Sequence, residues 1–144
     1  MFERILLAVD DSQESKKAIK TAISLAQATH GEILVVHVHA KEMGFQVKDD
    51  IETRLEAEQL IEAACDIVKK AGVPVVGDLR AGRIDHVAKE ILDAAESYDA
   101  DCIVVGSRGN GPFAQMLLGS VANQVVHLAR CPVIVARDTV PAAA

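Results

Sequence analysis

The 144-residue sequence predicts an α/β protein built on a single doubly wound parallel sheet of five strands, with helices on both faces. Short apolar runs without polar alternation recur along the chain, which is typical of parallel strands buried on both sides. Segments with apolar residues at helical spacing separate these runs, and this alternation indicates strands joined by crossover helices. Right-handed crossovers leave few topologies, and we expect the strand order 3-2-1-4-5.

The first strand is predicted over residues 5–9, a continuous apolar run that ends at the acidic pair Asp10 and Asp11. Asp11 or Ser12 is suited to cap the helix that follows, because a short side-chain oxygen accepts a free N–H of the first turn. That helix carries alanine, isoleucine and leucine at helical spacing. Gly31 is its expected stop.

The second strand is predicted over the buried run 33–38. The polar stretch 41–49 has no clear period and is expected to be a loop. Apolar residues spaced three and four apart over 57–71 predict a long helix, which ends at Gly72. The third strand, 73–79, contains proline and glycine, which favours a position at an edge of the sheet.

The remaining elements continue the same alternation. Residues 84–95 show the clearest amphipathic pattern in the chain and predict a helix. The run 102–105 predicts the fourth buried strand, 121–128 a last helix and 132–136 a short fifth strand. A ligand crevice is expected where the strand order reverses, between the first and fourth strands and beyond their carboxyl ends.

Length and composition indicate one ordinary globular domain, expected over residues 1–138, with a tail at 139–144. A content of 50% hydrophobic and 25% charged residues argues against disorder. The formal net charge of −6 argues against a broad basic surface for nucleic acid. An aromatic content of 3% leaves no base-stacking platform.

The location that we expect is cytoplasmic. No apolar run approaches the ~18 residues of a membrane span, and an apolar strand follows Met1 almost at once, so neither a span nor a signal peptide is expected. Cys65, Cys102 and Cys131 lie in apolar segments without metal-ligand spacing. We expect them to be buried, reduced thiols.

A glycine-rich segment follows the fourth predicted strand. Gly106, Gly109 and Gly111 lie within six residues of one another, where glycine lets backbone N–H groups turn toward a ligand. Further on, Gly119 and Ser120 open another helix, and Ser120 is an expected N-cap. The free N–H groups behind that cap favour an anion. Two clusters of backbone donors on one rim suit a polyphosphate, while a tight turn and an ordinary cap are the alternative.

These glycines carry a family resemblance. The spacing Gly106-x2-Gly109-x9-Gly119-Ser120 resembles the nucleotide motif in the ATP-binding branch of the universal stress proteins. The resemblance extends over residues 2–137. Three further stretches resemble the family's opening strand, its fourth strand with the turn, and its closing strand: residues 5–10, 99–109 and 131–135.

The resemblance implies a small UspA-like homodimer with an adenine nucleotide alpha hydrolase-like fold that binds ATP and acts in stress responses. ADP and AMP are the other candidate nucleotides, and Mg²⁺ or Mn²⁺ would accompany the phosphates. Asp10 would meet the ribose, and Val38 would line the adenine pocket. Arg108 would sit over the phosphates. The nucleotide-binding residues that the resemblance implies are Ala8, Val9, Asp10, Val38, Val105, Gly106, Arg108, Gly109, Gly119, Ser120 and Val121. Asp11 departs from the glycine that many members have.

A receiver domain of a two-component system is an alternative. It shares the five-stranded fold. Its first strand ends in an acidic pair that holds magnesium, and the first predicted strand here ends in the acidic pair Asp10 and Asp11. Ser107 would match its switch hydroxyl. A receiver also needs an acceptor aspartate at the end of its third strand, and Asp78 is not followed by the loop of that family. The lysine that follows the fifth strand of a receiver is missing here, and Arg137 lies near that position. A second alternative is the universal stress protein fold as an interaction module without nucleotide.

Catalysis is weakly supported by the sequence. Phosphoryl transfer needs a metal clamp, a cationic partner and a positioned nucleophile. The glycine segment offers Arg108, Ser107 and Ser120 but no evident base, so we expect at most slow ATP hydrolysis. His37 and His39 share one side of the second strand, and without an evident third ligand they do not predict a metal site.

The fifth strand predicts a homodimer interface. Val133, Ile134 and Val135 form a short, wholly apolar strand that comes last in the expected sheet order. An edge strand of that composition exposes unpaired backbone groups and favours pairing with a second copy about a two-fold axis. The family resemblance implies the same interface.

Overall fold

The computed structural model describes residues 1–41, 52–107 and 118–137. It contains one five-stranded parallel sheet in the order β3-β2-β1-β4-β5, which confirms the predicted topology. None of the helices in these ranges is long and apolar enough to cross a membrane. In chain order the elements are β1 (Arg4–Ala8), α1 (Gln13–Thr29), β2 (Glu32–Lys41), α2 (Arg54–Lys70), β3 (Val75–Arg83), the 3-10 turn η1 (Ile84–His86), α3 (Val87–Tyr98), β4 (Cys102–Gly106), α4 (Ser120–Leu128) and β5 (Val133–Ala136).

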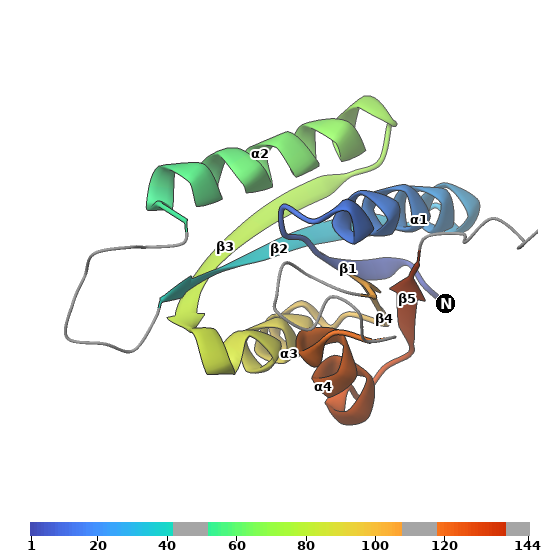
Figure 1. Ribbon diagram of the computed structural model, residues 1–144. Coiled ribbons are helices and arrows are strands. Elements are labelled where there is room, and N and C mark those ends of the chain that lie inside the picture. The colour runs from blue at the N-terminus through green and yellow to red at the C-terminus, as the bar shows by residue number, and fades with distance from the viewer. Residues whose placement is uncertain (42–51, 108–117, 138–144) are drawn as a thin grey trace, which may run out of the picture.

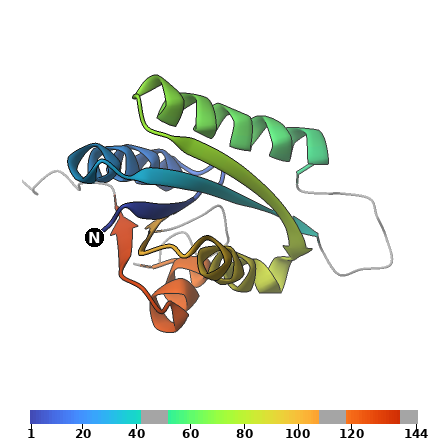
Figure 2. The same cartoon turned by 180° about the vertical axis from the view of Figure 1, so that it is seen from behind.

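The core has two layers, one on each face of the sheet. Helices α1 and α2 cover one face, and α3 and α4 cover the other (Figures 1 and 2). Because successive strand side chains point to opposite faces, Ile5 and Val35 pack with α1 and α2, whereas Leu6 and Val36 pack with α3 and α4. Apart from Cys102, the buried residues of both clusters are valine, isoleucine, leucine and alanine.

The first helix begins as predicted and ends one residue early. Ser12 is its N-cap, and the Ser12 hydroxyl accepts the N–H of Ser15 at 3.1 Å. The left-handed residue at its end is His30, with a φ of 55°, not Gly31. Gly31 is needed for another reason, because a Cβ there would lie 2.8 Å from the carbonyl oxygen of Glu3. The turn after α2 does place a glycine in the left-handed conformation, since Gly72 has a φ of 78°.

Strands β2 and β3 are longer than the sequence predicts. Their pairing runs in register from Ile33 opposite Val75 to Lys41 opposite Arg83, so the first residue of the expected loop 41–49 belongs to a strand. The rest of that loop lies outside the described residues, as does the expected tail at 139–144. This extension cannot be predicted from apolar runs, because the residues of this edge strand are largely polar and half exposed.

The three cysteines are free. Cys102 is fully buried, as expected, while Cys65 and Cys131 are only partly buried. Burial raises the pKa of the Cys102 thiol to about 11 and also raises the pKa of the other two. Because the thiolate is the reactive form, these surroundings keep the cysteines unreactive.

Candidate nucleotide-binding site

The strand order reverses between β1 and β4. The helix after β1 covers one face of the sheet and α4 covers the other (Figure 1). In doubly wound sheets the ligand crevice opens at such a reversal, beyond the carboxyl ends of the strands. In the described part of the chain, the predicted site residues lie at the end of β1 and the turn after it, on β2 two residues beyond the partner of Ala8, at the end of β4 and at the start of α4.

The β1–α1 turn is held by its own hydrogen bonds. The Asp10 carboxylate accepts the N–H of Ser12 at 2.8 Å, and the Asp10 N–H donates to the hydroxyl of Ser15 at 2.9 Å. The backbone of Val9 is fully engaged, since its N–H donates to the carbonyl of Val36 at 2.9 Å and its carbonyl oxygen lies 2.8 Å from Nδ1 of His37. The turn therefore presents the Asp10 carboxylate in one orientation at the end of β1.

Ser107 joins the end of β4 to the start of α4. Its N–H donates to the carbonyl of Ala136 at 2.8 Å, and its own carbonyl accepts the N–H of Gly119 at 2.6 Å. The residue is 2% exposed, so these bonds are shielded from water. Two predicted site segments, at Gly106 and at Gly119–Ser120, are thereby brought to the same edge of the sheet. This role of Ser107 cannot be predicted from the sequence, because backbone bonds between distant residues do not depend on residue type.

The start of α4 differs from the prediction by one residue. The N-cap is Gly119, with φ −66° and ψ 162°, and Ser120 is the first helical residue. The N–H of Gly119 is taken by Ser107, and the Gly119 carbonyl accepts the N–H of Asn123 at 2.9 Å. Because the first N–H groups of a helix lack partners within it, the helix offers the N–H groups of Ser120, Val121 and Ala122 to an anion.

Gly106 has a packing reason to be glycine. A Cβ at this position would lie 2.9 Å from the carbonyl carbon of Glu14 and 3.1 Å from the carbonyl oxygen of Glu14. The first turn of α1 therefore rests directly on the end of β4. This contact brings the β1–α1 turn, which carries Asp10, toward the β4 end of the site.

Four predicted residues share one apolar cluster. Val38 and Val105 are buried in the cluster on the α3 and α4 face, and Ala8 and Val121 are partly buried against it. The side chain of Val9 packs on the opposite face. Arg108 and Gly109, together with Gly111, lie outside the described residues.

A histidine pair and a carboxylate lie beside this edge. His37 and His39 on β2 are 7% and 8% exposed at their side chains, and Glu52 is 22% exposed. Nε2 of His37 lies 2.9 Å from Oε1 of Glu52, and Nδ1 of His39 lies 3.3 Å from Oε2. Nevertheless, the described part of the chain contains no group of three or more His, Cys, Asp or Glu residues that could hold a metal ion.

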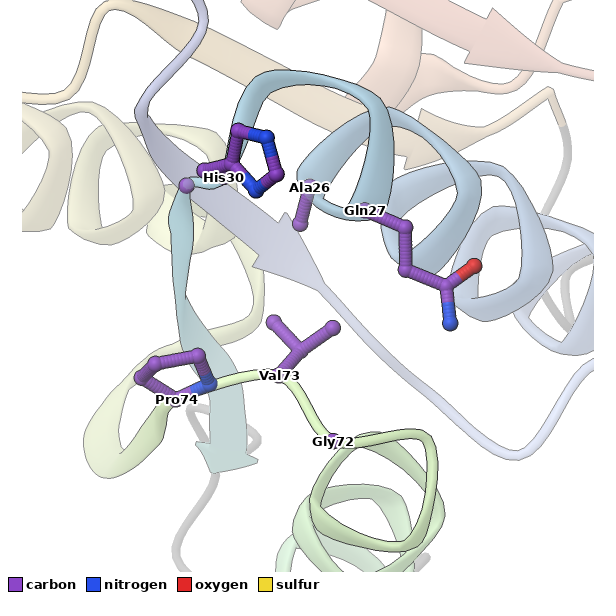
Figure 3. Close-up of a pocket in the computed structure, with 7 residues that line it drawn as sticks. Ala26, Gln27, His30, Gly72, Val73 and Pro74 are labelled. Carbon is purple, nitrogen blue, oxygen red and sulfur yellow. The ribbon is translucent and has the colours of Figure 1, made fainter.

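A cavity of about 330 Å³ lies at the other end of the sheet (Figure 3). It is formed where α1 ends and where the chain passes from α2 into β3. His30 is the one ionisable side chain in its lining, and no predicted site residue is among the lining residues: Ala26, Gln27, His30, Gly31, Gly72, Val73 and Pro74. This cavity is therefore separate from the candidate nucleotide site.

The fold and the sequence together define the class of protein. The solved structure of the hypothetical protein MJ0577 has the same fold as this doubly wound sheet, with a TM-score of 0.80 and 23% identity, and 98% of this chain and 99% of that chain are covered. The sequence profile of the universal stress protein family matches residues 1–137, and the chain belongs to that family.

Individual relatives agree with this assignment. A universal stress protein from Thermus aquaticus is 36% identical over 142 residues, which covers 95% of this chain and 100% of the relative. Universal stress protein YxiE from Bacillus subtilis is 30% identical over 149 residues, with 95% and 100% covered. The solved structure of the universal stress protein from Archaeoglobus fulgidus in complex with dAMP has a TM-score of 0.70 and 27% identity, with 94% of this chain and 99% of that chain covered.

Proposed function

We propose that this universal stress protein binds ATP at the carboxyl edge of the sheet, between β1 and β4, and acts as a nucleotide-dependent module of the stress response. The observation that carries the proposal is the bond from Gly119 to Ser107, which holds the start of α4 beside the end of β4. An anion site and the Asp10 carboxylate then lie on the two sides of the strand reversal. The dAMP complex of the relative from Archaeoglobus fulgidus supports an adenine nucleotide.

Each part of the nucleotide has a candidate partner. The phosphates meet the N–H groups of Ser120, Val121 and Ala122, where the helix dipole favours negative charge. The ribose hydroxyls donate to Asp10. The adenine packs against the apolar cluster that contains Ala8 and Val38. Mg²⁺ or Mn²⁺ would be held by the phosphates, since the described residues offer no side-chain cluster for it. We assign no catalytic residue and expect at most slow hydrolysis.

The second part of the proposal is a homodimer through β5. This strand lies at one end of the sheet order, and Val133, Ile134 and Val135 are each partly exposed. On the adjacent helix α4, Val126 is 44% exposed and Leu128 is 64% exposed. Exposed apolar side chains are therefore present on both β5 and α4. We also infer that residues 1–138 are the folding unit and that the protein is cytoplasmic.

Calorimetric titration with ATP, ADP and AMP, each with and without Mg²⁺, tests the nucleotide. We expect heat of binding with ATP, and a melting temperature that rises with ligand concentration by mass action. Absence of heat and of any melting shift with all three nucleotides would exclude the nucleotide function. The alternative function, an interaction module that binds no nucleotide, would then be favoured.

A further inference from the structure

His37 is bonded on both ring nitrogens. Nδ1 lies 2.8 Å from the carbonyl oxygen of Val9, and Nε2 lies 2.9 Å and 3.0 Å from the two carboxylate oxygens of Glu52. Nδ1 of His39 reaches the same carboxylate at 3.3 Å. Both imidazoles are buried, so these contacts replace the water that would otherwise solvate the rings.

The chemistry of the partners decides where the protons are. The carbonyl oxygen of Val9 can only accept, so Nδ1 of His37 carries a hydrogen. A carboxylate also only accepts, and a neutral imidazole has one N–H. The contact between His37 and Glu52 therefore needs one further proton, held by the imidazolium or by the carboxyl group. The pair is joined when it carries that proton, and without it a nitrogen lone pair faces a carboxylate.

Among the described residues, Glu52 is the carboxylate that contacts the ring of His37. On β2, His39 donates to Glu52 from Nδ1, which a neutral ring can do. On β3, Asp78 and Arg80 lie on the other face, where Arg80 bonds Glu90 of α3, while Arg83 is paired with Asp85. Two further carboxylates are held locally: that of Asp10 by the N–H of Ser12, and that of Glu56 by the hydroxyl of Thr53.

The pair connects two functional parts of the backbone. The carbonyl of Val9 immediately precedes Asp10, the residue that we assign to the ribose. Glu52 immediately precedes Thr53, the N-cap of α2, whose hydroxyl accepts the N–H of Glu56 at 3.1 Å. His37 thus ties the turn of the candidate site to the first turn of α2, which begins at Arg54.

We propose that His37 and Glu52 form a proton-dependent link that regulates the nucleotide site. With the shared proton, the start of α2 is fixed on β2 and the Val9 carbonyl is held in place. As the pH rises and the proton leaves, the link to Glu52 is lost while the bond to Val9 remains. The regulatory part rests on the proposed nucleotide function, whereas the link itself is a property of the protein without ligand.

Hydrogen exchange and NMR of the ligand-free protein test the link. Between about pH 5.5 and about pH 8, where histidine ordinarily changes charge, we expect the long-range ¹⁵N signals of His37 to show two protonated nitrogens at the acidic end and Nδ1–H alone at the other. Amide protection at Glu56 and Ala57, corrected for intrinsic exchange, should be about tenfold greater at the acidic end. A His37 ring without hydrogen on Nδ1, or protection that does not change with pH, overturns the proposal.

Two variants at one position separate the proton from the contact. In Glu52→Gln the side-chain amide can donate to the neutral Nε2 of His37, so the link should persist and its pH dependence should disappear. Glu52→Ala should show low protection throughout the range. The control Glu62→Gln removes an exposed carboxylate from within α2 and should behave as wild type. Pronounced pH dependence in Glu52→Gln contradicts the proposal.

The regulatory part is then measured by titration with ATP·Mg. If the link acts on the site, wild-type affinity should fall several-fold from the acidic to the alkaline end, and that of Glu52→Gln should not. An equal change in both proteins contradicts the coupling. Absence of ATP binding in every protein refutes the proposed function, and the ligand-free exchange experiment still decides whether the link exists.

Discussion

The N–H of Gly119 donates to the carbonyl oxygen of Ser107 at 2.6 Å. This bond is the point at which the last helix is attached to the end of β4. It also means that the amide of Gly119 is already engaged, so the phosphate donors that we propose are the next three amides of α4. Gly119 therefore contributes by its position and its small size, and charge can be introduced there without breaking the fold.

Gly119→Asp is expected to weaken ATP binding by about tenfold or more, because a carboxylate would lie next to the phosphates. The fold should be retained, since Gly119 is the N-cap of α4 and aspartate is a better N-cap than glycine. Calorimetric titration gives the affinity, and thermal unfolding gives the stability. Gly119→Asn is the matched control, with the same capping ability and no charge. If both variants bind ATP as wild type does, the phosphates lie elsewhere.

Ile134→Lys is expected to dissociate the dimer. Two copies of the charge would meet near the two-fold axis if β5 pairs with its own copy. Sedimentation equilibrium at micromolar concentration measures the association, which we expect to weaken by at least about tenfold. Val76→Lys places the same charge on the opposite edge, at a residue that is 62% exposed, and should leave the dimer intact. A wild-type monomer, or an Ile134→Lys dimer as tight as wild type, contradicts this interface.

Gly106→Ala is expected to lower the free energy of unfolding by about 1–3 kcal/mol, because its Cβ would press on the backbone of Glu14. The distance to the Glu14 carbonyl carbon would be 2.9 Å. Denaturant unfolding measures the loss. Gly82→Ala is the comparison, since its Cβ would meet the flexible side chain of Glu90 at 3.1 Å and should cost much less. Equal stabilities of the two variants would show that α1 can move off β4 freely.

Tyr98 is expected to make the protein less stable at high pH. Burial, with the neighbouring Glu32 carboxylate, raises the pKa of Tyr98 from 10.0 to about 12. The folded state therefore holds the phenol proton more tightly than the unfolded state does, and stability is lost as the pH rises through that interval. The chain has one tyrosine, so tyrosinate absorbance follows this group directly. Tyr98→Phe should remove this contribution, and ionisation near 10 in the folded wild type would refute it.

The sheet could be predicted because its signals are local. Runs such as 33–38 and 102–105 are buried on both sides, so their apolar character reports burial directly. The far half of β3 could not be predicted in this way. Its residues are stabilised by register with β2 and by ion pairs such as Arg80 with Asp78, which are properties of the assembled edge.

The candidate site could be predicted in outline, because glycine spacing and strand ends are visible in sequence. The one-residue difference at Ser120, and the capture of the Gly119 amide, depend on where α4 docks. The contact of His37 with Glu52 joins residues 15 apart through side chains alone. Neither residue is unusual in its own stretch of sequence, so the pair becomes recognisable once β2 and the start of α2 are placed together.

The two edges of the sheet are chemically unlike. β3 offers nine residues that include Asp78, Arg80 and Arg83, whereas β5 offers four apolar residues, Val133–Ala136. If either edge of one molecule paired with the other edge of the next, the contact would repeat without closing and would produce a filament. Charged side chains on β3 oppose such pairing with an apolar strand. This asymmetry therefore opposes the open-ended growth of a small parallel sheet into fibres, and it agrees with the two-subunit assembly that we propose.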